Sequence, residues 1–302
     1  MLKCSPYCVV LVLIISNSVF SQSKLDNFLK PSDTLNKFRR NTVVITEASL
    51  ASLTLLGLDQ LWYVDYPRSK FKTIDDSSEW LQMDKIGHVF SSYQLGRIGA
   101  SALNWAGVDA KNQLIYGSTL GLGFLTAVEV MDGFSEEWGF SWTDMAANVA
   151  GTGLYVGQEL LWKEQRIVLK YSFQRTEFAR KRPDKLGNGF TEEFLKDYNG
   201  QTYWLSANIN SFLKTDYIPN WINLAFGYGA DGMLTGDAND PLFLNQNRTR
   251  QYYLSLDIDL TRIKTKSQVL KTIFDVFNVI KIPFPTIELR SNGRLKAHYI
   301  YF

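Results

Sequence analysis

The chain has 302 residues, and its 32 Lys and Arg against 30 Asp and Glu leave a formal net charge of only +2. Because nucleic-acid binding needs a concentrated basic surface, this balance argues against a DNA or RNA partner. A hydrophobic fraction of 45% excludes intrinsic disorder. Aromatic residues reach 14%, which indicates a large core, an interface or a membrane boundary.

Residues 1–21 have the pattern of a secretory signal peptide. Lys3 supplies a short basic region, residues 8–15 are apolar, and Val19 and Ser21 occupy the −3 and −1 positions of a cleavage site before Gln22. The apolar run is shorter than the roughly 20 residues that cross a bilayer. We therefore expect export to the cell envelope, with a retained N-terminal anchor as the alternative.

Both cysteines of the chain, Cys4 and Cys8, lie inside this segment. A mature chain without cysteine has no disulfide, no thiolate nucleophile and no cysteine-based zinc site. Neither cysteine follows the apolar run, so a lipid-attachment cysteine is not expected.

A leader segment, residues 22–40, precedes a region with helical periodicity, residues 41–165. Four apolar segments stand out in this region, at approximately 43–62, 84–105, 112–131 and 142–162. Two G-x-x-x-G spacings, Gly117 with Gly121 and Gly153 with Gly157, are typical of helices that pack closely. The uncharged stretches are short for full membrane spans, so we expect a compact four-helix unit in or on a membrane surface.

From Arg166 to Phe302 the hydrophobic period changes from 3.6 to 2, which predicts an antiparallel β-rich region of about six strands. In residues 252–260, for example, apolar side chains alternate with Ser255, Asp257 and Asp259. A short helix is expected near 267–280. Asn292 and Gly293 predict a type I′ hairpin turn between the last two strands.

The expected fold class is therefore α+β, with an N-terminal bundle of about four apolar helices followed by the strands. An outer-membrane barrel is one alternative for the strands, because the chain ends on an aromatic residue and the strands match the length of barrel strands. Single-chain barrels have at least eight strands. Six strands leave open a sheet packed on the helices, a share of an oligomeric barrel, an undercounted barrel, or a soluble sheet with one wet face.

The polar residues that interrupt three of the helical segments form pairs at helical spacing. Residues three or four positions apart share a helix face, so each pair presents its side chains together. We expect these pairs to converge in a polar cluster at one end of the bundle. The candidate cluster consists of Asp84, Lys85 and His88, then Glu129 and Asp132, then Asp144 and Asn148.

The three motifs D-K-x-x-H, E-x-x-D-G and D-x-x-x-N-x-x-G, in this order, resemble the YfiM-like family of bacterial envelope proteins. More remotely, they resemble the VanZ-like membrane proteins linked to glycopeptide resistance. The resemblance covers about residues 75–160 and implies a helical envelope protein, without an established reaction. The chain differs from the small lipoprotein members in its long strand region and its lack of a lipid-attachment cysteine.

Structural explanations also exist for these residues. Ser141 fits a helix N-cap with Asp144 at the capping-box position, Lys85 fits a snorkelling surface residue, and His88 fits a hydrogen-bonded structural histidine. His88 and His298 are the only histidines and lie in different halves, so neither a multi-histidine metal site nor a cofactor is expected.

Two functions follow from the sequence. The favoured one is a non-enzymatic structural, assembly or transport protein of the envelope, in the outer membrane or alternatively the periplasm, with membrane lipid or an envelope protein as partner. The alternative is a membrane-surface enzyme that acts on lipid or lipid-linked glycan, with His88 and a nearby carboxylate as acid and base. The oligomeric state stays open.

Overall fold

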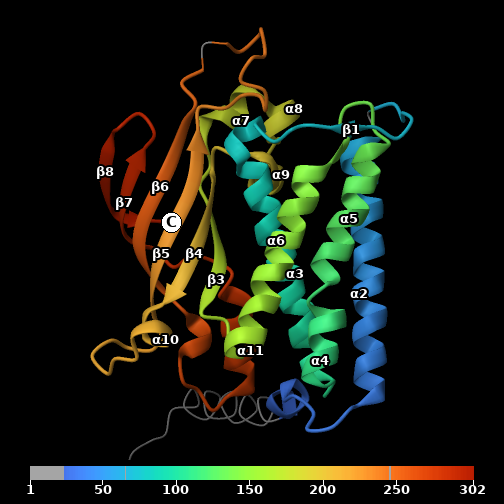
Figure 1. The fold of residues 1–302 in the computed structure, drawn as a ribbon, viewed down its shortest axis with the longest axis vertical. Coiled ribbons are helices and arrows are strands. Elements are labelled where there is room, and N and C mark those ends of the chain that lie inside the picture. The colour runs from blue at the N-terminus through green and yellow to red at the C-terminus, as the bar shows by residue number, and fades with distance from the viewer. Residues whose placement is uncertain (1–23, 65, 245) are drawn as a thin grey trace, which may run out of the picture.

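The computed structural model describes residues 24–302 apart from residues 65 and 245, so the expected signal peptide lies outside the described residues. Long helices form one side of the molecule and a six-stranded antiparallel sheet forms the other (Figure 1). The expected α+β class is confirmed. The four longest helices are α2 (Lys37–Leu58), α3 (Met83–Trp105), α5 (Leu120–Gly133) and α6 (Trp142–Trp162).

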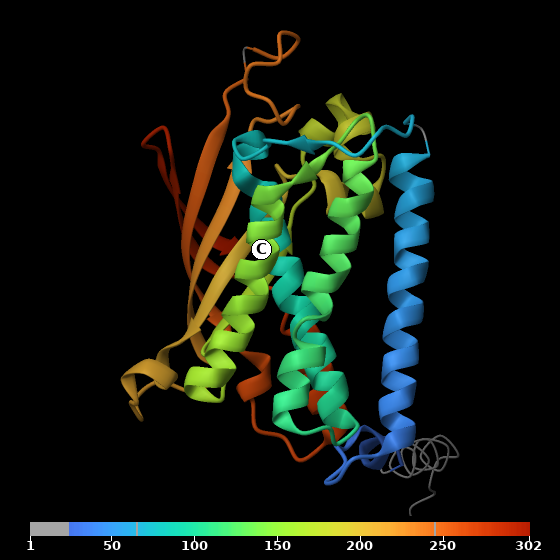
Figure 2. The ribbon, with the colours of Figure 1, turned by 45° about the vertical axis from the view of Figure 1, so that its right-hand side comes forward.

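Helix α3 lies at the centre of the bundle and packs against α5, α6 and the sheet, whereas α2 lies at the outer edge and contacts α3 and α5 (Figure 2). Four long helices lie in the four expected segments, but one of these segments is interrupted. The third segment is divided into α4 (Ala110–Asn112), a π-helical turn η3 (Gln113–Gly117) and α5. The interruption coincides with the closest approach to α3, where a Cβ on Gly117 would lie 2.5 Å from the Ala100 nitrogen.

Only one of the two G-x-x-x-G spacings serves helix packing. A Cβ on Gly121, like one on Gly117, would collide with α3, at 2.3 Å from the Ser92 carbonyl oxygen. A Cβ on Gly153 or on Gly157 would have no neighbour within 4 Å. The close helix contact is therefore between α3 and the segment of residues 117–121.

The large sheet has the strand order β3-β4-β5-β6-β7-β8, so every strand pairs with its neighbours in sequence. Strand β3 and strand β8 form its two edges, and the chain at 279–281 runs along β3, with the Tyr171 N–H donating to the Val279 carbonyl (2.8 Å). The six strands of the described residues form an open sheet and do not close into a single-chain barrel. Its strands are β3 (Ile167–Phe173), β4 (Gln201–Asn208), β5 (Ile222–Asp231), β6 (Thr249–Ile258), β7 (Phe284–Arg290) and β8 (Leu295–Tyr301).

Short elements connect these layers. The expected helix near 267–280 is α11 (Gln268–Phe277), and the β7–β8 hairpin is present. Its turn is not type I′, because only Gly293 of the Asn292–Gly293 pair has a positive φ (+81°). The periodicity did not predict the remaining elements: η1 (Asp59–Tyr63), β1 (Thr73–Ile74), η2 (Glu79–Gln82), β2 (Phe140–Ser141), α7 (Glu177–Lys181), α8 (Pro183–Leu186), α9 (Phe190–Lys196), α10 (Ile209–Leu213) and η4 (Leu260–Arg262).

The interior of the sheet holds a polar network beside an aromatic cluster of Trp204, Tyr253 and Tyr301. Lys170 Nζ lies 2.8 Å from Asp257 Oδ2, and both side chains are completely buried. The Ser206 hydroxyl donates to the same carboxylate (2.7 Å), and Asn223 donates to Ser206 (2.9 Å). The sheet curls around this interior, since the Tyr301 hydroxyl of β8 lies 3.2 Å from Thr202 of β4.

The outer face of the same sheet is apolar. Leu205, Phe226, Leu254 and Ile287 are cross-strand neighbours in register, and each is between 42% and 49% exposed. On β3 the same face is covered by the helices: Leu169, the partner of Leu205, is buried, and Phe90 of α3 packs against Tyr171. The alternation predicted two faces, and the structure turns the polar one inward.

Candidate polar cluster at the end of the helical bundle

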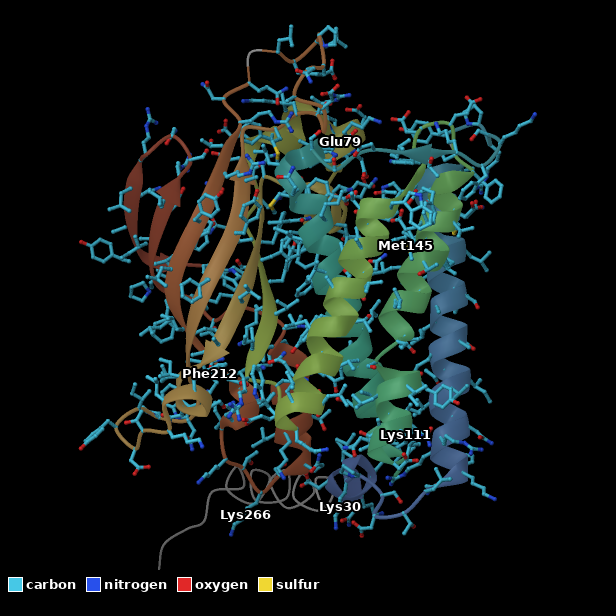
Figure 3. The ribbon with its side chains drawn as sticks, in the orientation of Figure 1. Lys30, Glu79, Lys111, Met145, Phe212 and Lys266 are labelled. Carbon is cyan, nitrogen blue, oxygen red and sulfur yellow. The ribbon has the colours of Figure 1, made fainter. Side chains whose placement is uncertain are left out.

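The seven candidate residues lie together at one end of the bundle, near the labelled Glu79 and Met145 (Figure 3). The start of α3 contributes one group, the end of α5 the second, and the start of α6 the third. Five of them line a cavity of about 490 Å³, and the other two, Lys85 and Asn148, bond to residues that line it. The pairs predicted from the helical spacing of three or four residues therefore lie on helix faces that meet.

An unusual turn sets the start of α3. Trp80, Leu81 and Gln82 all have left-handed φ angles of 47°, 51° and 64°. Side chains from the sheet hold this turn: Tyr228 donates to the Leu81 carbonyl (2.5 Å), and Arg250 donates to Gln82 Oε1 (2.6 Å). Consecutive left-handed residues other than glycine persist only where surrounding contacts enforce them. The sheet thus fixes where α3 begins, and with it the positions of Asp84, Lys85 and His88.

Ser141 caps α6, as expected, because its hydroxyl accepts from the Asp144 N–H (3.1 Å). The reciprocal bond of a capping box is absent at Asp144. Glu129 Oε2 instead accepts from the Ser141 N–H (3.0 Å). This exchange leaves the Asp144 carboxylate available for the cluster, and it ties the end of α5 to the start of α6.

Lys85 does not snorkel to the surface. Its ammonium donates to Asp76 (2.6 Å), Asp84 (3.0 Å) and Asp144 (2.9 Å). Burial lowers the pKa of Lys85, but the Asp84 and Asp144 carboxylates outweigh burial and raise it above its ordinary value. Burial also raises the pKa of Asp144 to about 6, and the neighbouring Asp84 charge adds to the effect. In Asp84 the cations His88 and Lys85 outweigh burial, so that pKa is lowered.

His88 lies between an amide and three carboxylates. Its Nδ1 is 3.0 Å from Asn148 Oδ1. Its Nε2 is 3.9 Å from Asp84 Oδ1, 3.7 Å from Glu129 Oε1 and 3.9 Å from Asp144 Oδ1. Burial lowers the pKa of His88, but the surrounding negative charge outweighs burial and raises it.

Three further residues contact the cluster but were not predicted from the sequence. The Tyr63 hydroxyl donates to Asp132 (2.6 Å), and the Tyr198 hydroxyl donates to Asp84 (2.6 Å). Asp76 binds Lys85 from a loop. None of the three lies at a helical spacing from the other members, so only the fold reveals them.

Aromatic rings form much of the cavity wall above the charged groups. Such walls beside carboxylates suit a cation, because both the ring faces and the carboxylates attract positive charge. A histidine beside carboxylates can also exchange a proton. The rings belong to Trp62, Tyr63, Tyr66, Trp80, Trp138 and Tyr198.

The fold and site define a mixed α+β protein with a buried charged cluster where its helical bundle ends. Residues 74–158 match the family model described as "Predicted periplasmic lipoprotein (DUF2279)". The matched segment contains all seven candidate residues and Asp76, and it supports a bacterial cell-envelope protein. It does not show the finer YfiM-like or VanZ-like resemblance. Searches of curated proteins and of solved structures found no match to the chain.

Proposed function

We propose that this envelope protein is associated with the outer membrane and has a structural, assembly or transport role rather than a catalytic one. The observation that carries the proposal is the polarity of the sheet from β4 to β7, where the face with the polar network is buried and the apolar face is about half exposed. Outer-membrane strands have the same arrangement, with apolar side chains toward lipid and polar side chains toward the interior.

The apolar face of the sheet is continuous across strands. Leu205, Phe226, Leu254 and Ile287 are register partners on β4 to β7, so their side chains form a row. Leu256 and Leu289 widen the exposed surface on either side of the row. Large continuous apolar patches on a protein surface mark contacts with another protein or with a membrane.

A second apolar surface lies on α2, on the opposite flank of the molecule from the sheet (Figures 1 and 2). Leu50, Leu53 and Leu56 are all exposed there. By length and composition alone, two helical stretches could cross a membrane, Lys37–Leu58 and Ala110–Gly133, and only 6% of the apolar window in the first is buried. Apolar surface on both flanks favours lipid over a single protein partner.

Charged groups bracket these apolar surfaces. Lys30, Lys111 and Lys266 lie at one end of the molecule, and Glu79 with the polar cluster lies at the other (Figure 3). Basic side chains at the end of an apolar belt suit the phosphates of lipid head groups. The arrangement gives the proposed partner, membrane lipid, both an apolar and an ionic contact.

Fractionation of cells that express the full chain tests the proposal. We expect the protein in the outer-membrane fraction, with release only by detergent. The double variant Leu254→Lys, Ile287→Lys should weaken membrane retention, because charge on a lipid-facing strand is costly. The matched control is Leu242→Lys, which changes a leucine that is 83% exposed in the β5–β6 loop. Recovery of the wild type in the soluble periplasm without detergent would show the proposal to be wrong.

The position of His88 favours a second candidate function, an acid/base enzyme that acts on lipid or lipid-linked glycan. His88 lines the cavity and faces Asp84, Glu129 and Asp144 through one ring nitrogen. The separate variants His88→Ala and Asp144→Asn distinguish this function. If cells with either variant show the wild-type phenotype and both variants fold normally, His88 and Asp144 are not catalytic.

A further inference from the structure

The space around His88 Nε2 has the dimensions of a metal site. Three carboxylate oxygens surround this nitrogen at 3.7 to 3.9 Å, which is too far for hydrogen bonds. The ligating atoms of Asp84, His88 and Asp144 lie within 4.8 Å of one another. Two ligands of one ion, each bonded at about 2.0–2.2 Å, stand roughly 3–3.6 Å apart. The distances from His88 Nε2 exceed this range by only a few tenths of an ångström, and the carboxylate oxygens must approach each other by at most about 1.2 Å to surround one ion.

The neighbour of the other ring nitrogen orients His88 for ligation. The Asn148 Oδ1 accepts a hydrogen bond from Nδ1–H, and in the neutral tautomer with this proton the lone pair of Nε2 points at the carboxylates. Metal-bound histidines regularly donate their second N–H to a fixed acceptor in this way. Asn148 is completely buried and lies one helical turn after Asp144 on α6.

A buried carboxylate oxygen points at the same space without a hydrogen bond. The Asp144 side chain is only 5% exposed, and its Oδ1 has no hydrogen-bond partner. Lys85 Nζ lies 2.8 Å from this oxygen, but the geometry directs its hydrogen bond to Oδ2 (2.9 Å). The oxygen is therefore compensated in charge by this ammonium but accepts no hydrogen bond, and a metal ion bound at Oδ1 would give it a direct ligand.

The balance of charge in the cluster also calls for a cation. Within the cluster, Lys85 and His88 are the basic residues against five acidic ones, while Lys185 and Lys196 lie elsewhere in the cavity wall. Burial of the acidic groups makes their mutual repulsion strong. Lys85 cannot compensate the whole group, since its ammonium reaches Asp76, Asp84 and Asp144 but makes no bond to Glu129 or Asp132. The acidic side chains are Asp76, Asp84, Glu129, Asp132 and Asp144.

We propose that Asp84, His88 and Asp144 bind one divalent first-row transition-metal ion, with Glu129 as a further ligand from α5. Imidazole together with carboxylates suits ions such as Zn²⁺ and Mn²⁺. The ion would join the start of α3, the end of α5 and the start of α6. It would therefore stabilise the wall of the cavity, and this role is independent of lipid contact.

Metal binding by the purified full chain in detergent tests the site. After treatment with a chelator and dialysis, Zn²⁺ or Mn²⁺ alone is added, and elemental analysis gives the ions retained per chain. We expect one ion per chain and a higher temperature of thermal unfolding with metal. His88→Gln and Asp84→Asn should each bind at least tenfold more weakly. His298→Gln is the matched control, since His298 contacts Glu288 in the sheet (2.6 Å) and should leave metal binding unchanged.

Substitution with Co²⁺ gives a readout that a purely structural role of His88 would not move. The wild type and His298→Gln should show the visible ligand-field absorption of a protein-bound ion, and His88→Gln should lose it. Equal metal retention in the wild type, His88→Gln and Asp84→Asn would overturn the proposal. If His88→Gln fails to fold, Asp84→Asn decides alone, because its side chain is an isostere and a quarter exposed. Membrane fractionation does not depend on this result, so the two proposals fail separately.

Discussion

Two buried charged networks in the molecule have opposite character. In the sheet, Asp257 receives Lys170, Ser206 and the Ile282 N–H, and the network is closed from solvent. In the bundle, the cluster around His88 has more acidic than basic residues, holds an oxygen of Asp144 that accepts no hydrogen bond, and opens on a cavity. Fully partnered buried networks specify a fold, whereas incompletely partnered ones need a reason to persist. The sheet network is structural, and the bundle network is the candidate site.

The largest expected effect breaks the closed network. Asp257→Asn removes the carboxylate that compensates Lys170, and Lys170 is completely buried. Loss of one partner of a buried ion pair costs about 3–5 kcal/mol, because the remaining charge is uncompensated. Chemical denaturation in detergent should show this loss in the free energy of unfolding. Asp275→Asn is the control, because Asp275 is a partly exposed partner of Arg97 and should cost at most about 1 kcal/mol.

An intermediate effect of opposite sign is expected at Lys281, a second buried lysine in the sheet interior. Burial lowers the pKa of Lys281 from 10.5 to about 8. The unfolded chain therefore binds more protons than the folded chain between these values, and the stability of the wild type rises with pH from about 8 to 10.5. Lys281→Met should lack this rise and gain about 1–3 kcal/mol at pH 7. Parallel pH profiles for the two proteins would contradict the assignment.

The sequence predicted much of the fold because periodicity reports local geometry. The alternation in residues 252–260 predicts β6 and its two faces. Alternation does not say which face is inward, since that depends on how Lys170 on β3 meets Asp257 on β6. The breaks in the third helical segment and the short helices α7 to α9 escape prediction because tertiary packing determines them.

At the candidate site, too, some residues were predictable from the sequence and others were not. Helical spacing places Asp84 with His88 and Asp144 with Asn148 on shared faces, so the seven residues are found from the sequence. Their partners Tyr63, Tyr198 and Asp76 come from other elements and are not found. The distances at His88 Nε2 are also a property of the fold alone. The sequence analysis looked for several histidines in one site, so it could not predict a metal site that contains a single histidine.

The smallest expected effect tests the bundle network with the same change of residue type that breaks the sheet network. Asp132→Asn keeps an oxygen that accepts from the Tyr63 hydroxyl and removes one negative charge from a group with too many. We expect the free energy of unfolding to change by less than about 1 kcal/mol, because relief of repulsion offsets a weaker hydrogen bond. Denaturation alongside Asp257→Asn measures the contrast directly. A loss as large as that of Asp257→Asn would mean that Asp132 is as tightly compensated as Asp257, and that the cluster is a closed structural network after all.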